Sequence, residues 1–347
     1  MMGDGERLES LAFPDRDPSL KGVIRRLSEP ETGRAADNFV SNEDSYPRVA
    51  GELARRCPQN AVYLGVGPDQ NFTMIAQARP RLAFVIDNRR RNLRLHLLHK
   101  SLTALSVDRV GYLRRLTARE PVRPLPIDPT AADLVAGFGP PPMDPKRLAA
   151  EIFEVRRTIE PLGILDEVEW ADLATIQAKL AGPGLSARFL ALPMYPTLAK
   201  LLTTNDRAGR PAHWLAQEST YQVVRDLQRT DRVVPLVGDF AGSTALQALG
   251  DWLRGRSFKV GVCYTSDVEF FLIRAMRFDR FIANLSSLPW ADGALIVRSS
   301  TREIQHPDRV SGDSSTTTIA PVAPFLERAK AGKIRSVDDL FALGSSH

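Results

Sequence analysis

The chain has 347 residues, of which 43% are hydrophobic and 25% are charged, and its formal net charge is +5 at pH 7. These proportions are those of a globular protein with a full core. No apolar run reaches the roughly 18 residues that a membrane span needs, and the polar, acidic start of the chain lacks the apolar segment of a secretory signal. We therefore expect a cytoplasmic protein without a membrane segment.

The basic charge is concentrated at Arg89, Arg90, Arg91 and Arg94. No aromatic residues are interleaved with these arginines as in a binding stripe, so a nucleic-acid partner is disfavoured. A phosphate contact and a solvated helix start are the two interpretations of the run. The two cysteines, Cys57 and Cys263, are too few for a disulfide framework, and their apolar surroundings predict buried thiols.

The first third of the chain predicts one strand–helix–strand unit. Residues 1–40 suggest an irregular lead-in, and a polar loop with Ser45 as a helix cap leads to a helix that Pro58 ends. The apolar run 62–66 predicts a strand, and a helix then runs to Pro80. The run 82–86 predicts the second strand, so the unit should be right-handed and parallel.

Residues 119–213 are rich in Pro and Gly, contain helical stretches such as 148–159, and show no convincing buried strand. We interpret this segment as a mainly helical insertion that builds a lobe or lid. The α/β pattern then resumes, with these expected elements: a helix over 214–228, strands over 233–237, 260–264, 281–283 and 293–297, a loop or edge strand over 311–318, and a last helix capped by Ser336 and stopped by Gly344.

These elements predict an α/β fold, with a Rossmann-like, mostly parallel sheet, flanking helices and a mainly helical insertion. The expected division is a lead-in and first half of the sheet domain over 1–118, the insertion over 119–213, and the second half with the C-terminal helix over 214–347.

Gly65 and Gly67 follow the first strand, and Asp87 ends the second. This pattern is typical of a nucleoside site, because glycine lets the backbone approach the ligand and the acid accepts hydrogen bonds from the ribose hydroxyls. A dinucleotide fingerprint needs a third glycine where this chain has Gln70, which argues against NAD and FAD. Asp87 can also act as a helix cap.

Two later strands also end in polar residues. Gly238 and Asp239 follow the third strand, where a carboxylate can accept from the amino group of an adenine, and Ser266 and Asp267 follow the fourth. The carboxyl ends of strands are where open α/β sheets bind ligands. Ser266, Asp267 and Glu269 can instead be a helix cap and its first-turn acids.

With these residues, the chain resembles the class I S-adenosylmethionine-dependent methyltransferases over 62–87 and 233–267. The strings YLGVGPDQNF, VPLVGDFAG and SNEDSY also resemble an uncharacterised bacterial methyltransferase-like family. The resemblance implies that Gly65 and Gly67 pass under the methionine and ribose, that Asp87 holds the ribose and that Asp239 holds the adenine. Such enzymes usually carry an acid at the position of Tyr63, for which Glu43 or Asp69 could substitute.

The resulting hypothesis is an S-adenosylmethionine-binding protein that methylates a small molecule. The expected cofactor-binding residues are Gly65, Gly67, Asp69, Asp87, Gly238 and Asp239, the substrate-binding residues Glu43, Tyr46 and Ser266, and the catalytic base Asp267. The alternatives are a non-catalytic nucleoside-binding or regulatory protein and an NAD-dependent oxidoreductase.

Two further pairs of residues have weaker functional interpretations. His96 and His99 stand three residues apart, but no nearby acid or cysteine completes a metal site, so we expect no metal. Tyr195 and Trp214 can line a substrate pocket or belong to the core.

Overall fold

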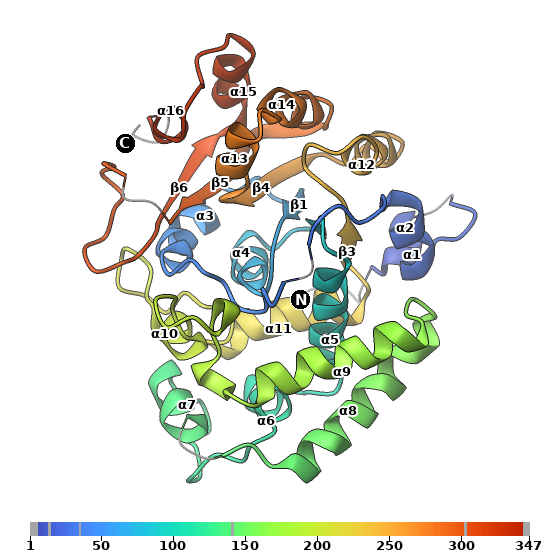
Figure 1. The fold of residues 1–347 in the computed structure, drawn as a ribbon, viewed down its shortest axis with the longest axis vertical. Coiled ribbons are helices and arrows are strands. Elements are labelled where there is room, and N and C mark those ends of the chain that lie inside the picture. The colour runs from blue at the N-terminus through green and yellow to red at the C-terminus, as the bar shows by residue number, and fades with distance from the viewer. Residues whose placement is uncertain (1–5, 13–14, 35, 140–141, 302–303, 343–347) are drawn as a thin grey trace.

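The computed structural model describes residues 6–12, 15–34, 36–139, 142–301 and 304–342. Its centre is a six-stranded sheet in the order β3-β2-β1-β4-β5-β6 (Figure 1). The strands are β1 (Val62–Gly65), β2 (Leu82–Asp87), β3 (Val233–Val237), β4 (Val260–Ser266), β5 (Trp290–Ser300) and β6 (Thr316–Pro321). The first five strands are parallel, and β6 pairs antiparallel with β5. This is the strand order of a doubly wound Rossmann sheet, so the predicted α/β, Rossmann-like fold is confirmed.

The parallel strands form from continuous apolar runs because both of their faces are covered. Every residue of β2 and β3 is buried. Pro235 lies within β3, and it is tolerated there because β3 is an edge strand with one unpaired side.

Helices cover both faces of the sheet (Figure 1). One face carries α3 (Ala50–Arg56), α4 (Gln70–Ala78), α5 (Arg90–Ala104) and α11 (Glu218–Arg229), and the other carries α2 (Leu20–Leu27), α12 (Ala245–Arg254), α14 (Phe278–Ser286) and α15 (Val322–Lys330). Three short helices complete this part of the fold. Helix α1 (Leu8–Ala12) packs against α2, α13 (Val268–Arg274) packs against β4, and α16 (Val337–Phe341) packs against α13. The 3-10 turn η1 (Tyr46–Val49) precedes α3.

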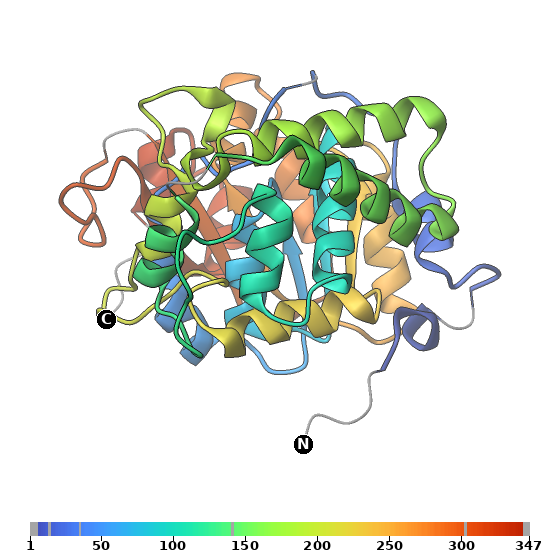
Figure 2. The same ribbon diagram turned by 90° about the horizontal axis from the view of Figure 1, so that it is seen from below.

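The connection between β2 and β3 holds most of the remaining helices. They are α6 (Arg109–Thr117), α7 (Ala131–Phe138), α8 (Pro145–Ile159), α9 (Glu167–Ala181) and α10 (Leu198–Thr203), with 3-10 turns η2 (Glu160–Leu162), η3 (Gly184–Ser186) and η4 (Phe189–Ala191). Seen from below, α8 and α9 (green) lie across α5 (Figure 2). Phe138, Val155 and Trp170 belong to the same apolar cluster as the strands, so these helices share the core of the sheet.

Two secondary-structure predictions are wrong. Residues 20–27 form the helix α2 instead of part of an irregular lead-in, with Ser19 as its cap and Leu20, Val23, Ile24 and Leu27 buried at helical spacing. Residues 281–283 lie in helix α14, not in a strand. Between the two alternatives for 311–318, the structure has an edge strand, β6, that begins at Thr316.

Other local predictions are confirmed. Ser336 caps α16 in a capping box with Asp339, while Gly344 lies outside the described residues. Cys57 and Cys263 are buried free thiols. In the described part of the chain, no helix combines the length and the apolar character that crossing a bilayer requires.

Candidate functional site

A cavity of about 420 Å³ opens at the carboxyl ends of β1, β2, β3 and β4. We call it the switch-point cavity, because the chain leaves β1 toward β2 on one side and β4 lies on the other. Open α/β sheets bind their ligands at such a point, and the volume is in the range of small-molecule pockets. Its lining includes Arg34, Asn38, Asn42, Val66, Gly67, Gln70, Asp87, Asn88, Arg89, Phe189, Gly238, Asp239, Phe240, Ser266, Asp267, Phe271, Leu272 and Arg277.

The predicted site residues divide into two groups. Gly67, Asp87, Gly238, Asp239, Ser266 and Asp267 all line the switch-point cavity. Gly65, Asp69, Glu43 and Tyr46 are buried and lie outside this lining.

The turn after β1 is held by one asparagine. Asn71 Nδ2 donates to the carbonyl oxygens of Val66, Gly67 and Pro68 at 2.9, 3.1 and 2.8 Å, and Asn71 Oδ1 accepts from the Tyr63 hydroxyl at 2.9 Å. Gly67 completes the turn with φ of +88°, a conformation that favours glycine. Tyr63 therefore positions the side chain that fixes this turn.

Gly65 leaves room for the contact between Tyr63 and Asn71. A Cβ at residue 65 would lie 2.0 Å from Asn71 Oδ1 and 2.6 Å from the Tyr63 hydroxyl. We expect Gly65→Ala to lower the free energy of unfolding by about 1–3 kcal/mol, the usual cost of overpacking. Urea unfolding measures the change, and Gly255→Ala is the control, since a Cβ there meets ordinary contacts at 3.5 Å. Equal stabilities of the two variants would contradict this role for Gly65.

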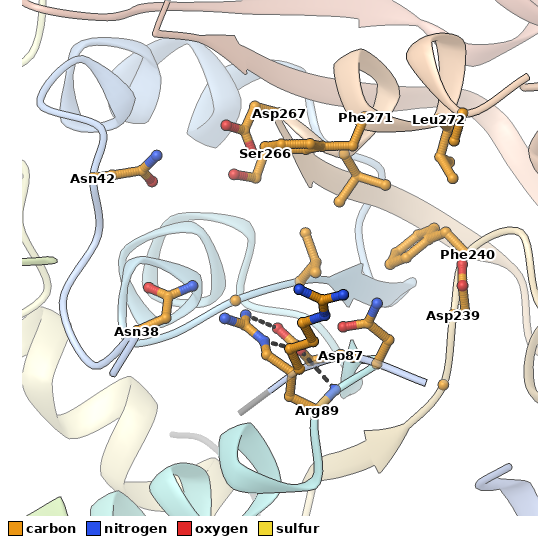
Figure 3. A pocket seen from close by; sticks show the side chains of 18 of the residues that line it. Asn38, Asn42, Asp87, Arg89, Asp239, Phe240, Ser266, Asp267, Phe271 and Leu272 are labelled. Atoms are coloured by element: carbon orange, nitrogen blue, oxygen red, sulfur yellow. Dashed lines mark hydrogen bonds and ion pairs between the residues drawn. The ribbon is translucent and has the colours of Figure 1, made fainter. Parts of the chain in front are cut away.

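Asp87 does not stand alone in the cavity. The Arg89 guanidinium holds both of its carboxylate oxygens, with Nε at 2.7 Å from Oδ1 and Nη2 at 2.6 Å from Oδ2 (Figure 3). The backbone amide of Arg89 also donates to Oδ1, at 3.0 Å. An oxygen of a carboxylate can accept two hydrogen bonds, so Oδ2, with one bond from the described residues, retains one position for a ligand hydroxyl.

Asp239 lies next to Asp87 because of the sheet register. The amide of Gly238 donates to the Asp87 carbonyl at 2.9 Å and thereby continues the pairing of β3 with β2. The Asp239 carboxylate accepts from the Ala241 amide at 2.8 Å and from Arg277 at 2.9 Å. Asp239 and Arg277 both line the cavity, and each Asp239 oxygen accepts one of these two hydrogen bonds, so each oxygen retains an acceptor position.

Ser266 and Asp267 form the opposite wall, above Asp87 and Arg89 in Figure 3. Ser266 has a left-handed φ of +55°, which is strained for a residue other than glycine. The Ser266 hydroxyl donates to Glu43, whose other carboxylate oxygen accepts from the Tyr264 hydroxyl. Glu43 is fully buried. Through these two hydrogen bonds it fixes the carboxyl end of β4 from the protein interior.

Glu43 and Asp267 influence one another electrostatically. Burial, followed by the negative charge of Asp267, raises the pKa of Glu43. Burial also raises the pKa of Asp267, although Asn42, Ser266 and Arg89 counteract it. Two neighbouring carboxyls of this kind titrate as a pair, and a carboxyl with a raised pKa that lines a cavity is suited to accept or donate a proton.

The rest of the polar loop 41–46 anchors to the region before β6. Asp44 accepts from the amides of Ser314 and Ser315, and the Ser45 hydroxyl lies 2.7 Å from those of Ser315 and Thr317. Ser45 makes no cap hydrogen bond to the turn that follows it. The predicted cap is therefore wrong, and the loop instead closes one side of the cavity through Asn42.

Asp69 and Tyr46 lie in the protein interior. Both are buried, and His213 Nε2 is 4.0 Å from the Asp69 carboxylate. Burial raises the pKa of Asp69 to about 7, while it lowers the pKa of His213 to about 3. Trp214 belongs to this same interior, whereas Tyr195 packs against Phe189 at the cavity, with ring centroids 4.9 Å apart.

The arginine run is neutralised within the fold. Arg90 and Arg94 both pair with Glu169, and Arg91 pairs with Asp37 and Asp172. With the Arg89–Asp87 pair, every arginine of the run has a carboxylate partner, so none is left unpaired for a phosphate. Glu169 and Asp172 belong to the insertion, which these ion pairs connect to α5.

The two histidines of α5 are core residues. His96 Nε2 is 2.9 Å from the Gly67 carbonyl, and His99 Nδ1 is 2.7 Å from the Tyr112 hydroxyl. Burial lowers the pKa values of His96 and His99 to about 4 and 3. Among the described residues, no three of the side chains that bind metals gather at one point.

Several lining residues were not predicted. Asn88 and Phe240 directly follow Asp87 and Asp239, so the strand-tip argument could have included them. Phe271 and Leu272 lie on α13, one helical turn beyond Asp267. Phe189 comes from the connection between β2 and β3, where the sequence carries no motif that points to the cavity.

The fold and the cavity define this chain as a Rossmann-like α/β protein with a cavity at the switch point of its sheet. The chain belongs to the family described as "Domain of unknown function (DUF7790)", whose model matches residues 38–124 and 191–343. A comparison with curated proteins finds no match.

Proposed function

We propose that the switch-point cavity binds S-adenosylmethionine and that the protein transfers its methyl group to a small molecule. The observation that carries the proposal is the convergence of four strand tips on one cavity. Asp87 ends β2, while Gly67, Asp239 and Asp267 follow β1, β3 and β4 respectively, and all four line the cavity. The resemblance to methyltransferases assigns three of these residues to the cofactor.

The donor and acceptor chemistry of the cavity fits an adenosyl group. Gly67 lines the cavity with main-chain atoms alone, which suits a close approach of a ligand, and a Cβ there would lie 2.8 Å from Gln70 Nε2. Asp87 can accept from a ribose hydroxyl through Oδ2, and Asp239 can accept from the amino group of an adenine. Phe240 offers an apolar ring beside Asp239 (Figure 3).

The cofactor, when bound, supplies an activated methyl group on a positively charged sulfur. The protein then has to align the acceptor with that methyl group and exclude water. For an acceptor with an O–H or N–H nucleophile, the acceptor proton passes to the Asp267 carboxylate. Asp267 is suited to this step because it lines the cavity and has a raised pKa.

Replacement of Asp239 by Asn tests the ligand assignment. We expect S-adenosylhomocysteine to bind 10- to 100-fold more weakly, because a hydrogen bond to a charged group contributes about 1.5–3 kcal/mol. Isothermal titration calorimetry measures the affinity. Asp251→Asn is the matched control, since the Asp251 side chain is 78% exposed. Absence of binding to the unaltered protein, or equal affinity in both variants, would refute the assignment.

A non-catalytic nucleoside-binding protein is the second candidate, and two observations favour it. Tyr63 replaces the usual acid, and Arg89 holds Asp87 in a bidentate ion pair. This candidate predicts tight binding of S-adenosylmethionine without release of S-adenosylhomocysteine in the presence of small-molecule extracts. Methyl transfer to any extract component would exclude it.

Gln70 argues against an NAD-dependent oxidoreductase. Its side chain is buried, lines the cavity and lies against Gly67, at the start of α4 where a pyrophosphate would need close access to the helix. A thermal-shift comparison separates the two ligands, and a rise in melting temperature with NAD but not with S-adenosylhomocysteine would favour the oxidoreductase.

A further inference from the structure

A second cavity, of about 530 Å³, lies beside the switch-point cavity, and we call it the side cavity. Two chain segments divide the cavities. In the first segment, Asn38 lines the switch-point cavity while Phe39 lines the side cavity. In the second segment, Phe189 lines the switch-point cavity while Leu190 lines the side cavity. The Leu190 amide donates to the Asp37 carbonyl at 3.3 Å, so the two segments form one shared wall.

The backbone of this wall is strained. Leu190 and Ala191 have consecutive left-handed φ values of +50° and +56°. Such a conformation is unfavourable for residues other than glycine, and it persists where the surrounding structure enforces it, often at binding sites. The strain therefore marks the segment that places Phe189 in one cavity and Leu190 in the other.

The side cavity combines an apolar lining with excess positive charge. Phe39, Val40, Leu180 and Leu190 supply much of its apolar surface. Its charged lining residues are two cations and one acid: Asp37 pairs with Lys179 at 2.5 Å, and Arg188 has no carboxylate partner among the described residues. Arg188 Nη1 donates only to the Pro193 carbonyl, at 3.0 Å, so its guanidinium retains donors for an anion.

We infer that the side cavity binds an amphipathic anion, with its apolar body against Phe39, Leu180 and Leu190 and its acidic group at Arg188. Because the cavity shares a wall with the switch-point cavity, this anion binds next to the proposed cofactor. That last assignment rests on the proposed function, whereas the site itself rests on the lining residues.

The family match covers the two cavities to different extents. The match leaves out residues 125–190. Lys179, Leu180, Arg188 and Leu190, which form one wall of the side cavity, fall in that segment. The strand tips around the switch-point cavity lie within the match. One wall of the side cavity therefore lies outside the family match, whereas Phe39 and Val40 of the same cavity lie within it.

Octanoate and 1-octanol are the probes for this inference, because they share a chain length and differ in charge. Isothermal titration calorimetry on the full chain should show octanoate binding at least 10-fold more tightly than 1-octanol. Arg188→Gln should weaken octanoate binding about 10-fold or more, and Arg188→Lys should retain most of it. Arg229→Gln, at an exposed arginine on α11, is the control and should change nothing.

A second variant tests the apolar wall. Asn tolerates a left-handed backbone, so Leu190→Asn keeps the fold of the wall and should weaken both probes. Equal binding of octanoate and 1-octanol, or octanoate binding that Arg188→Gln leaves unchanged, would overturn the inference. S-adenosylhomocysteine affinity should be unaltered in Arg188→Gln. If octanoate binds and S-adenosylhomocysteine does not, the proposed function is refuted and the side-cavity site stands. If S-adenosylhomocysteine binds and octanoate does not, the side-cavity site alone is refuted.

Discussion

Asp69→Asn is expected to have a higher free energy of unfolding than the unaltered chain, and this difference should grow as the pH rises from 4 to 7. Asp69 has a folded-state pKa of about 7 against an ordinary value of 3.8, because it is buried. Between these values the unfolded chain releases the proton and the folded chain keeps it, so the contribution of Asp69 to stability is complete below pH 3.8 and is lost as the pH approaches 7. Each pKa unit corresponds to about 1.36 kcal/mol, so the raised pKa of Asp69 lowers the free energy of unfolding by about 4 kcal/mol at pH 7.

Urea unfolding of both proteins at several pH values between 4 and 7 measures this effect. The difference in unfolding free energy should grow with pH, since an amide has no such proton to lose. His96, His99 and His213 also titrate with lowered pKa values, but they are present in both proteins and largely cancel in the difference. Asp251→Asn should show a difference that is independent of pH, and a pH-independent difference for Asp69→Asn would contradict the burial of its carboxyl.

Glu269→Gln should be the most destabilising of the single substitutions considered, with a loss of about 3–5 kcal/mol in unfolding free energy. Glu269 and Arg298 form an ion pair at 3.2 Å, with side chains only 3% and 1% exposed. Arg298 also lies over the Phe325 ring at 4.5 Å and donates to the Leu340 carbonyl at 3.2 Å. Removal of the carboxylate leaves this arginine buried without its counter-ion.

Two comparisons make this prediction specific. Asp251→Asn removes the exposed Arg254–Asp251 pair and should cost at most about 0.5 kcal/mol. The double variant Glu269→Gln with Arg298→Met should recover part of the loss, because no unpaired charge remains. If Glu269→Gln costs less than about 1 kcal/mol, the pair does not anchor α13. Since α13 carries Phe271 and Leu272 of the cavity wall, the same variant should also weaken ligand binding.

The strands and the strand tips could be predicted from the sequence for a physical reason. Buried parallel strands are continuous apolar runs, and the carboxyl ends of parallel strands meet at one edge of a sheet. On this ground the sequence predicts that Asp87, Asp239 and Asp267 lie at one edge of the sheet, and all three line the switch-point cavity. The missed helix α2 had a readable signal as well, with Ser19 as cap and apolar residues at helical spacing.

The parts that could not be predicted depend on side-chain direction and on contacts between distant residues. Asp69 is two residues from Gly67, yet its side chain lies in the interior beside His213. Glu43 contacts Ser266, 223 residues away in the sequence. The side cavity combines residues from the N-terminal segment with residues near 180–191, and no local pattern in the chain indicates that these segments meet.

The strand order also has a consequence for synthesis on the ribosome. The central strand β1 is complete by residue 65, but its partner β4 pairs Val260 with Val62. At the usual 5–20 residues per second, one hydrogen-bonding edge of β1 waits on the order of 10 to 40 seconds for β4 to be made. During this time an apolar strand edge is open to pairing with other chains. The nascent chain should therefore depend on chaperones until β4 has emerged.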